Sequence, residues 1–247
     1  RAVDLDSLFA AADAAYPAAW DTVDRGEGAP VCVPNAPGPI LYGIRGDDPT
    51  AVASVAAGVD SEPVHDRALF VTNQGTDVHV QEGTLGDLAD GRAYRITADV
   101  VSAPETRAGG HVFFAVGDGD ETLQCVAFEP TKRFRDRVRA LRAGDRVTVV
   151  GEVTDGTLKL EKFAVRDLNA TTLATPTCPS CGTTMESAGR DQGYRCRDCG
   201  TSASGKVEQS VDRDLAVGWY EVPPVARRHV VKPLVRGGFD APTHPER

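Results

Sequence analysis

The sequence predicts an α+β protein made of several small domains, and three patterns along its 247 residues support this. Helices alternate with short strands in the first third, apolar and polar residues alternate through the middle, and two Cys-x-x-Cys pairs follow. We assign four parts in chain order: a partial ferredoxin-like domain whose first strand is missing (1–80), an OB-fold β-barrel (81–170), a zinc ribbon (171–210) and a C-terminal extension (211–247).

The first domain shows the order helix, strand, strand, helix, strand. Apolar residues at helical spacing predict a helix over 3–18, and Asp48 followed by Pro49 predicts the start of a second helix over 49–58. Short extended pieces are expected at 21–24, 30–34 and 40–44, and a strand is expected at 68–72. This is the order of a β-α-β-β-α-β unit without its first strand. Because the chain also begins at Arg1 without an initiator Met, we expect it to be the C-terminal part of a longer protein.

The middle of the chain predicts a five-stranded barrel. Alternation of apolar and polar residues indicates the strands, and the turns Gly117-Asp-Gly-Asp120 and Thr154-Asp-Gly-Thr157 each indicate a hairpin. The strands are expected at 92–101, 110–116, 121–128, 146–153 and 158–166, with a helix over 131–141. Three strands, a helix and two strands form the order of an OB-fold, a common platform for single-stranded nucleic acid.

Four cysteines form a metal-binding motif: Cys178, Cys181, Cys196 and Cys199. Two Cys-x-x-Cys turns bring four sulfurs to one tetrahedral centre, the geometry that structural zinc prefers. Gly182 and Gly200 follow the two pairs, where a flexible backbone lets each turn close. Two disulfides, a redox pair and iron are the alternatives. Cys32 and Cys125 lie in apolar runs, so we expect them to be buried free thiols.

The C-terminal extension contains the sequence Trp219-Tyr-Glu-Val-Pro-Pro224, which its prolines should hold extended. One short helix is expected over 225–233. The last ten residues are rich in Gly, Pro and charge, and we expect them to be disordered.

The net charge of −9 is concentrated at the front, because residues 1–66 carry −8 and the remaining residues carry −1. Arg outnumbers Lys by 22 to 5. Abundant Asp with this bias indicates adaptation to high salt, where the Debye length falls to about 3 Å at 1 M, so the acidic balance does not exclude nucleic acid. No apolar run approaches the roughly 20 residues that span a bilayer, and no signal peptide opens the chain. We expect a cytoplasmic protein of a halophile, without a membrane partner.

Motifs of self-sufficient catalysis are missing from the sequence. It contains no Walker lysine motif, dinucleotide fingerprint or nucleophile elbow, and Gly117-Asp-Gly-Asp120 joins two strands instead of opening a helix. The five His residues are scattered and fit no metal-ligand motif. The catalytic residues are therefore unknown from this chain.

Cationic and aromatic side chains are the candidates for contact with RNA. Around the barrel loops they are Arg107, His111, Phe113 and Lys159, and after the ribbon they are Arg227, Arg228, His229 and Lys232. Either Phe113 or Phe114 offers a stacking surface, depending on a register that the sequence does not fix. Ordinary core or rim packing is the alternative for the barrel residues, and a solvated tail is the alternative for the later cluster. The basic run 132–139 lies on the barrel helix, where a solvated face competes with RNA contact.

Several ordered segments resemble one known family. They are Asp21-Thr-Val-Asp24-Arg25, Pro39-Ile-Leu-Tyr-Gly-Ile-Arg-Gly46, Thr72-Asn-Gln-Gly-Thr-Asp77 with His79, the ribbon cysteines, and residues 220–234 with their Pro-Pro and Arg-Arg-His. In this order, over nearly the whole chain, they resemble the archaeal tRNA-isoleucine agmatinylcytidine (agmatidine) synthetases. No single motif is decisive, but the ordered set is specific.

The resemblance implies a tRNA-modifying ligase with an N-terminal kinase-like domain, a ferredoxin-like domain, an OB-fold and a structural zinc ribbon. Such an enzyme uses ATP and Mg to activate the C2 oxygen of the wobble cytidine in isoleucine tRNA with a CAU anticodon, and agmatine displaces that oxygen. The kinase-like domain has no counterpart here, so the ATP site and catalytic residues are expected upstream. The present domains are expected to bind the tRNA, whose base must leave the stack, and to help form the agmatine pocket.

The resemblance points to three segments as the walls of that agmatine pocket. The candidate residues are Asp21, Asp24, Gly43, Arg45, Gly46, Asn73, Gln74, Thr76 and Asp77. The three carboxylates suit a dication, although acidic surface on a salt-adapted protein would explain them as well. For the second and third segments, a connecting loop or an ordered domain hinge is the alternative. The main rival is a non-enzymatic single-stranded DNA-binding protein of the replication protein A type, which leaves the second and third of these segments without a role. A purely structural partner subunit is the third reading.

Overall fold

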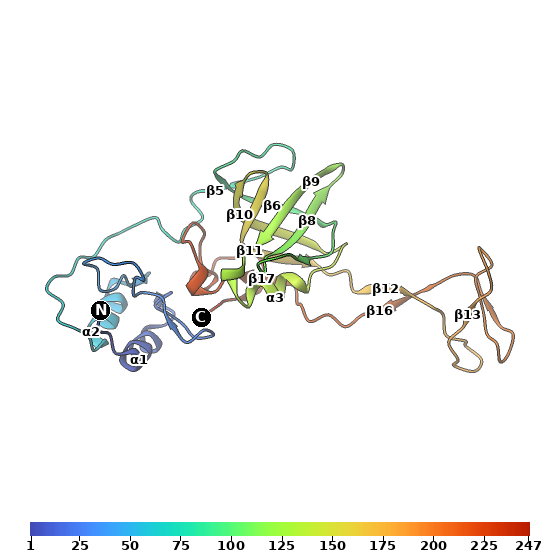
Figure 1. Ribbon diagram of the computed structural model, residues 1–247, viewed down its shortest axis with the longest axis horizontal. Coiled ribbons are helices and arrows are strands. Elements are labelled where there is room, and N and C mark those ends of the chain that lie inside the picture. The colour runs from blue at the N-terminus through green and yellow to red at the C-terminus, as the bar shows by residue number, and fades with distance from the viewer. The chain divides into compact units, whose positions relative to one another are not determined.

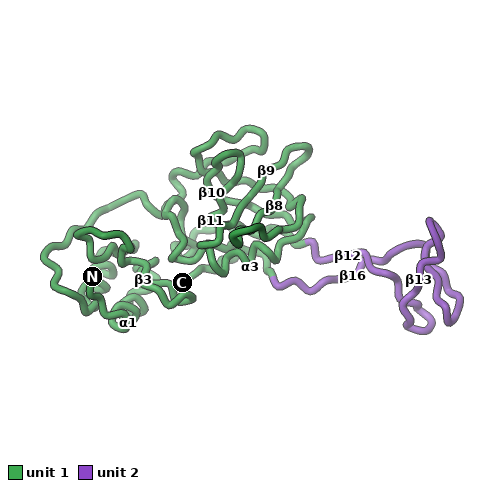
Figure 2. Tube along the Cα trace, viewed as in Figure 1, with its two compact units in different colours: residues 1–168, 215–247 green, residues 169–214 purple.

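The computed structural model describes all residues 1–247, and the chain divides into two compact units (Figures 1 and 2). Unit 1 comprises residues 1–168 and 215–247, and unit 2 comprises residues 169–214. The predicted α+β class is confirmed, with a closed barrel in unit 1 and a four-cysteine ribbon in unit 2. None of the helices has both the length and the apolar character that crossing a membrane requires.

A closed five-stranded barrel lies in unit 1, as predicted. Its strands are β6 (Arg92–Val100), β8 (Val112–Asp118), β9 (Glu121–Ala127), β10 (Arg146–Thr154) and β11 (Thr157–Asp167). β10 pairs with both β6 and β11, and β9 pairs in parallel with β11, which closes the ring. The β10–β11 turn is Asp155-Gly156, both with positive φ, as a two-residue hairpin turn requires. The helix between β9 and β10 is shorter than expected: a 3₁₀ turn (Glu129–Thr131) precedes α3 (Phe134–Arg139).

The barrel sheet continues into four short strands outside the ring. They are β5 (Val80–Glu82) beside β6, β7 (Glu105–Thr106) beside β8, β17 (Gly218–Glu221) beside β11, and β18 (Thr243–His244) beside β17. The C-terminal extension is therefore ordered on the barrel, and the expected disorder of its end is wrong. The helix expected over 225–233 is also wrong, because only 3₁₀ turns form, at Pro224–Ala226 and Leu234–Arg236. Burial explains this, since Val231 and Leu234 pack with Trp219 on the outer face of the barrel.

The front domain, residues 1–79, is built around two helices. α1 (Leu5–Ala15) and α2 (Pro49–Gly58) pack together through the fully buried side chains of Leu8 and Val55. Asp48 caps α2 as predicted by accepting a 2.8 Å hydrogen bond from the backbone of Thr50. Two pairs of short strands complete the domain: β1 (Ala19–Trp20) with β4 (Arg45–Gly46), and β2 (Val23–Asp24) with β3 (Ala29–Pro30).

The strand expected at 68–72 does not form. Leu69, Phe70 and Val71 are 65%, 76% and 104% exposed, and the segment is neither helix nor strand. A strand needs a neighbour that pairs with its backbone N–H and C=O groups, and none pairs with this segment. The high strand propensity of these residues was therefore not sufficient. The extended piece expected at 40–44 is likewise replaced by the two-residue β4.

Unit 2 has a stem and a ribbon. The stem is the antiparallel pair β12 (Thr171–Ala174) and β16 (Val207–Ser210), and the ribbon is the sheet of β13 (Glu186–Ser187), β14 (Tyr194–Arg195) and β15 (Ser202–Ala203). The clustered buried side chains of the ribbon are Cys178, Met185 and Cys196. Such a small core cannot hold a fold together alone, so the ribbon depends on metal binding.

Candidate functional site

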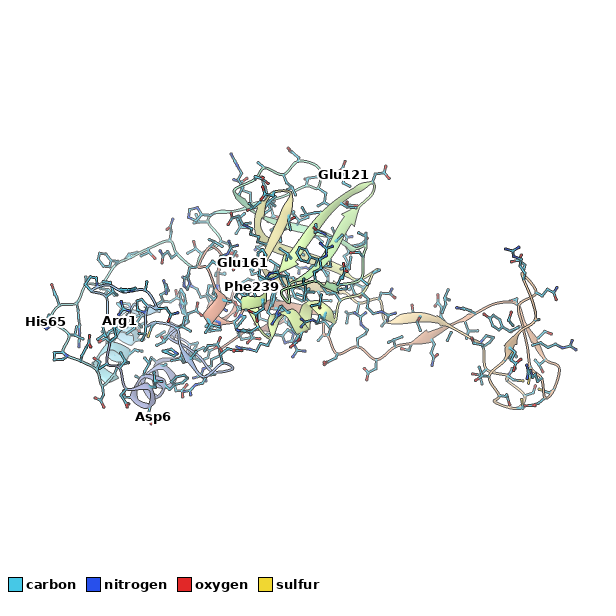
Figure 3. All side chains as sticks on the ribbon, in the orientation of Figure 1. Arg1, Asp6, His65, Glu121, Glu161 and Phe239 are labelled. Atoms are coloured by element: carbon cyan, nitrogen blue, oxygen red, sulfur yellow. The ribbon has the colours of Figure 1, made fainter.

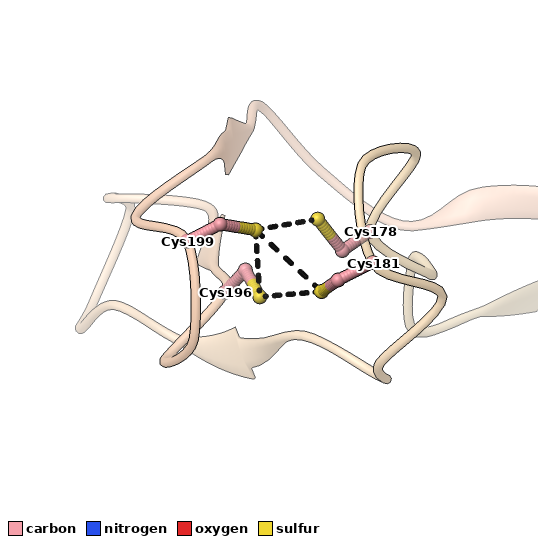
Figure 4. Close-up of side chains that lie close together, drawn as sticks. All are labelled: Cys178, Cys181, Cys196 and Cys199. Atoms are coloured by element: carbon pink, nitrogen blue, oxygen red, sulfur yellow. Dashed lines mark hydrogen bonds between the residues drawn. The ribbon is translucent and has the colours of Figure 1, made fainter.

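The four ribbon cysteines converge on one centre. Their Sγ atoms all lie within 4.8 Å of one another, and the closest pairs are 3.2–3.5 Å apart (Figure 4). Four sulfurs about 2.3 Å from a tetrahedral zinc ion would be separated by about 3.8 Å, so the cluster fits zinc. All four cysteines are free, which removes the disulfide alternative. The cluster is a closed structural zinc site.

The two halves of the zinc site have the same local geometry. The backbone N–H of Gly182 donates to Cys178 O at 2.9 Å, and that of Gly200 donates to Cys196 O at 3.0 Å. Both glycines have positive φ, 75° and 72°, a conformation that side chains disfavour. The predicted role of these glycines in closing the turns therefore matches the geometry. Each turn presents two sulfurs, and the ribbon brings the two turns together.

Two predicted RNA contacts, Phe113 and Lys159, lie on the same outer face of the barrel. The backbone register pairs Glu105 with Phe113, Phe113 with Val126, and Val126 with Lys159 across four neighbouring strands. Cross-strand partners point to the same face, so these four side chains form a row, which we call the outer row. Val126 within the row is only 1% exposed. Phe114 points inward and is 2% exposed, which settles that Phe113 faces outward.

Arg107, a third predicted contact, covers the aromatic member of the outer row. Its guanidinium carbon lies 4.2 Å from the centre of the Phe113 ring, an arrangement in which the ring attracts the cation. The guanidinium occupies that face of the ring, and its own outer plane offers a stacking position for an unpaired base. Lys159 at the other end of the row supplies a second positive charge.

The basic helix is tied to the loop that carries Arg107. Arg139 Nε donates to Thr106 Oγ1 at 3.1 Å, and Arg135 Nη1 donates to Gly110 O at 2.6 Å. His111 in the same loop accepts a 2.9 Å hydrogen bond from the backbone of Glu129 through Nδ1. The ring of His111 is thereby fixed and does not join the outer row. The arginines of α3 border the candidate RNA site.

The predicted cationic cluster after the ribbon is divided by burial. Arg227 is 1% exposed and pairs with Asp21 and, at 2.8 Å, with Glu221. That burial corrects its expected contact with RNA, because a buried guanidinium held by two carboxylates has no surface for a phosphate. Arg228 is 39% exposed and pairs with Glu161 and Glu152, and Lys232 is half-buried.

Asp24, expected in the agmatine pocket, is fully buried in contacts within the chain. Its Oδ1 accepts from Arg133 Nη1 and from the backbone of Glu27, each at 3.0 Å, and its Oδ2 accepts from the backbone of Val225 at 3.3 Å. The carboxylate thus connects the front domain, the start of α3 and the C-terminal extension. It is positioned to hold these parts together.

Asp21 and His229 face each other in a buried polar cluster. Asp21 pairs with Arg227 through Oδ1, while its Oδ2 lies 3.7 Å from His229 Nδ1, and both of these atoms are buried without a hydrogen-bond partner. Burial raises the pKa of Asp21, and Arg227 opposes the rise. Burial, with the charges of Arg45 and Arg227, lowers the pKa of His229 to about 4. Both residues also adopt positive φ, which is uncommon outside glycine.

The second predicted pocket segment lies beside this cluster. Arg45 pairs with Trp20 in the β1–β4 ladder, and its charge acts on His229. Gly46 is required by packing, because a Cβ there would lie 2.5 Å from Ala18 O. Gly43 is exposed, and its N–H donates to Cys32 O at 2.8 Å.

The third predicted segment, residues 73–77, meets the other two at Trp20. We call it the amide loop. Gly75 is buried against Trp20, where an added Cβ would lie 2.8 Å from the indole, and its N–H donates to His229 O at 2.8 Å. The side chains of Asn73 and Gln74 are exposed. Thr76 Oγ1 donates a 2.6 Å hydrogen bond to Asn73 O, and the carboxylate of Asp77 binds Lys162. Three segments far apart in the sequence therefore converge at Trp20.

Sequence reasoning missed the residues that hold this arrangement. Lys162, Arg133 and Glu221 make buried or half-buried ion pairs, yet none of them was a candidate. For Lys162 a sequence signal existed, because strict alternation along the predicted strand places it on the same face as Leu158, Leu160 and Ala164. For Arg133 the sequence held no signal beyond a run of similar charges.

Comparisons with known proteins match the whole chain. The family model described as the TiaS FLD domain matches residues 1–79, that of an OB-fold nucleic acid binding domain matches 91–161, and that of the TiaS C-terminal zinc ribbon domain matches 175–215. The isoleucine-tRNA 2-agmatinylcytidine synthetase TiaS of Haloquadratum walsbyi is 55% identical, over 100% of this chain and 62% of that protein.

Solved structures agree with these matches. The complex of a TiaS enzyme with its isoleucine tRNA and ATP is similar with a TM-score of 0.88 and 42% identity, over 100% of this chain and 58% of that one. The complex of TiaS with the same tRNA, AMPCPP and agmatine is similar with a TM-score of 0.85 and 39% identity, over 100% and 59%. The chain thus spans about 60% of the length of these relatives. The resemblance found in the sequence is confirmed, and the chain belongs to the TiaS family of isoleucine-tRNA 2-agmatinylcytidine synthetases.

Proposed function

We propose that this chain is the tRNA-binding and substrate-binding part of an ATP-dependent ligase that attaches agmatine to C2 of the wobble cytidine in isoleucine tRNA with a CAU anticodon. The observation that carries the proposal is the match over the whole chain to relatives that bear this name and were solved with isoleucine tRNA, an ATP analogue and agmatine. ATP and Mg are assigned to no residue of this chain. The enzyme would act in the cytoplasm.

The outer row is the proposed binding site for an unpaired base of the tRNA. Phe113 supports the guanidinium of Arg107, whose outer plane supplies the stacking surface, and Lys159 with the arginines of α3 neutralises the neighbouring phosphates. Arg228 and Lys232 remain candidates for phosphate contact on the C-terminal extension, and His229 would act through the polar cluster. We retain the domain boundaries at 80, 170 and 210 as our proposal for the ends of the ferredoxin-like domain, the OB-fold and the zinc ribbon.

The agmatine pocket is proposed at the convergence of the three segments around Trp20. The exposed side-chain amides of Asn73 and Gln74 are the groups that accept hydrogen bonds from a dication. Asp21 is buried behind them, where its Oδ2 faces His229. Thr76, Gly43, Arg45 and Gly46 shape the surroundings of these groups. Asp24 and Asp77 would serve this pocket by fixing its walls, since their carboxylates are already engaged.

The zinc ion would take no part in the reaction. Four thiolates fill its coordination shell and leave no position for a substrate or an activated water. The ribbon is proposed to grip RNA.

Binding under matched high salt tests the proposal against its rival. We expect the chain to bind isoleucine tRNA with a CAU anticodon more tightly than oligo-dT of equal charge, whereas a replication protein A type module would prefer oligo-dT. The chain alone should incorporate no labelled agmatine into that tRNA. Robust incorporation would show that the catalytic residues lie within residues 1–247, and a preference for oligo-dT would refute the proposed function.

A further inference from the structure

Lys162 is a buried cation on the outer side of the barrel. Its side chain is 0% exposed on β11, beside the side chains that cover the outer face of the barrel. Its Nζ lies 4.8 Å from the Phe239 ring centre and 5.8 Å from that of Trp219; Phe239 is labelled beside the barrel in Figure 3. A buried ammonium is costly unless other groups replace its water.

Asp77 and the C-terminal extension replace that water. Nζ of Lys162 lies 2.9 Å and 3.1 Å from the two carboxylate oxygens of Asp77 and 3.0 Å from Lys232 O. These three contacts use all three donors of the ammonium. Asp77 Oδ1 also accepts from the backbone N–H of Lys232 at 2.8 Å, and Arg95 lies 3.4 Å from Oδ2. One carboxylate therefore joins the barrel, the extension and the amide loop.

The amide loop is buried and anchored in its second half and exposed in its first half. Asp77 is fixed by Lys162, and Gly75 is fixed by His229 O, by Trp20 and by Arg236, whose Nη1 donates to Gly75 O at 2.5 Å. Residues 73–74 are exposed, and the Asn73 amide nitrogen lies 3.2 Å from His79 Nε2 in the segment that follows Asp77. The anchored half therefore determines where the exposed amides lie.

Burial alone does not explain an ion pair at this place. An apolar side chain would cover Trp219 and Phe239 without the desolvation that Lys162 requires, and replacing buried ion pairs by apolar residues is often neutral or stabilising. What an apolar residue cannot provide is a directional bond that fixes Asp77. The pair is thus suited to setting position.

We propose that Lys162 is a positioning residue for the agmatine pocket: through Asp77 it fixes the amide loop against Trp20, so that the amides at 73–74 are held where the cationic substrate binds. This inference rests on the proposed function. It also makes the amide loop the connection between that pocket and the barrel that holds RNA.

The two tryptophans of the chain allow a direct test. In a Trp219→Phe background, Trp20 is the only tryptophan, and its quenching by acrylamide reports whether Gly75 still covers it. Lys162→Met should raise this quenching at least about twofold and weaken agmatine binding about tenfold or more, while tRNA affinity stays within about twofold. Arg146→Met is the matched control, because it breaks the exposed Arg146–Asp99 pair of the same barrel. It should change neither the quenching of Trp20 nor the affinities for agmatine and tRNA.

The outcomes separate this inference from the proposed function. A folded Lys162→Met chain with unchanged quenching and unchanged agmatine affinity would overturn the positioning role. If Lys162→Met does not fold, the pair Lys162→Met with Asp77→Asn removes both charges together, and unchanged Trp20 quenching and agmatine affinity in that variant would overturn it equally. If the unaltered chain binds neither tRNA nor agmatine, the proposed function fails, while the quenching of Trp20 still decides whether Lys162 positions the loop.

Discussion

Nη1 of Arg133, at the start of the barrel helix, donates a 3.0 Å hydrogen bond to the carboxylate of Asp24, which is 0% exposed on strand β2 of the front domain. The same guanidinium reaches Glu246 at 2.5 Å, near the C-terminus, and Glu27 at 3.5 Å. One arginine thus forms ion pairs with carboxylates of the front domain and of the C-terminal extension. Where neighbouring domains meet through buried charge in this way, losing one partner leaves the other desolvated and unpaired.

Asp24→Asn should therefore destabilise the chain. Asparagine keeps the size and an acceptor oxygen but loses the charge that faces Arg133, and we expect the free energy of unfolding to fall by about 1–3 kcal/mol. Glu27→Gln is the matched control: its carboxylate is 33% exposed at the longer distance, so it should cost less than about 1 kcal/mol. Urea unfolding monitored by circular dichroism measures both. Equal losses in the two variants would show that burial of Asp24 does not matter.

The zinc ribbon should fold only with its metal. Cys196→Ser removes one of four ligands, and because the ribbon buries so few other side chains, we expect it to unfold while the barrel keeps its cooperative transition. Zinc content should fall and tRNA affinity should weaken. Ser180→Ala, in the same kind of Cys-x-x-Cys turn but outside the ligand set, should leave zinc content and affinity unchanged. Unchanged tRNA binding by the metal-free ribbon would refute its proposed grip on RNA.

Phe113→Ala tests the outer row. Base stacking on an aromatic face contributes about 1–3 kcal/mol, so the variant should bind the target tRNA roughly 5- to 150-fold more weakly at constant salt. Phe70→Ala is the matched control, because Phe70 is 76% exposed in the front domain and lies outside the row. Filter binding over a salt series gives both affinities. Equal weakening by the two substitutions would remove Phe113 from the RNA site.

The features that local patterns determine were predictable from the sequence. Alternation indicated the barrel strands, cysteine spacing indicated the ribbon, and Asp48 with Pro49 indicated the start of α2. Local patterns cannot show that Arg227 pairs with Asp21 across 206 positions, because only the assembled fold brings these charges together. The missing strand at 68–72 fails for the same reason, since pairing depends on a neighbour and not on propensity.

The residues proposed for the agmatine pocket show this division most clearly. The resemblance selected three segments, and the fold brings them together at Trp20, but it assigns their side chains different tasks. Asp24 and Asp77 are engaged in ion pairs, whereas Asn73 and Gln74 are exposed. From the sequence, the carboxylates were the first candidates for contact with agmatine, because their charge suits a dication. Only the structure shows which carboxylates are buried and already paired.

His229 should make stability depend on pH. Its folded pKa of about 4 lies below its ordinary value of 6.5, so between these two values the unfolded chain binds a proton that the folded chain does not. Stability from this residue is therefore present above pH 6.5 and is lost as the pH falls to 4. Glu221 acts in the opposite sense, because burial raises its folded pKa from 4.5 to about 7, and its contribution falls as the pH rises through that window.

His229→Asn should separate the two effects, since Asn tolerates the positive φ of 60° at this position. Between about pH 6.5 and 4 the variant should lose less stability than the unaltered chain, by at most about 1.4 kcal/mol per pH unit and by less than that because the ring is partly exposed. Glu221→Gln should shift the slope the other way. His65→Asn is the control, because His65 is exposed on the front domain (Figure 3) and should leave the slope unchanged. Urea midpoints from about pH 4 to 7.5 measure all four chains. An unchanged slope in His229→Asn would mean that His229 takes up its proton as readily in the fold as in the unfolded chain, and that its cluster with Asp21 is open to water.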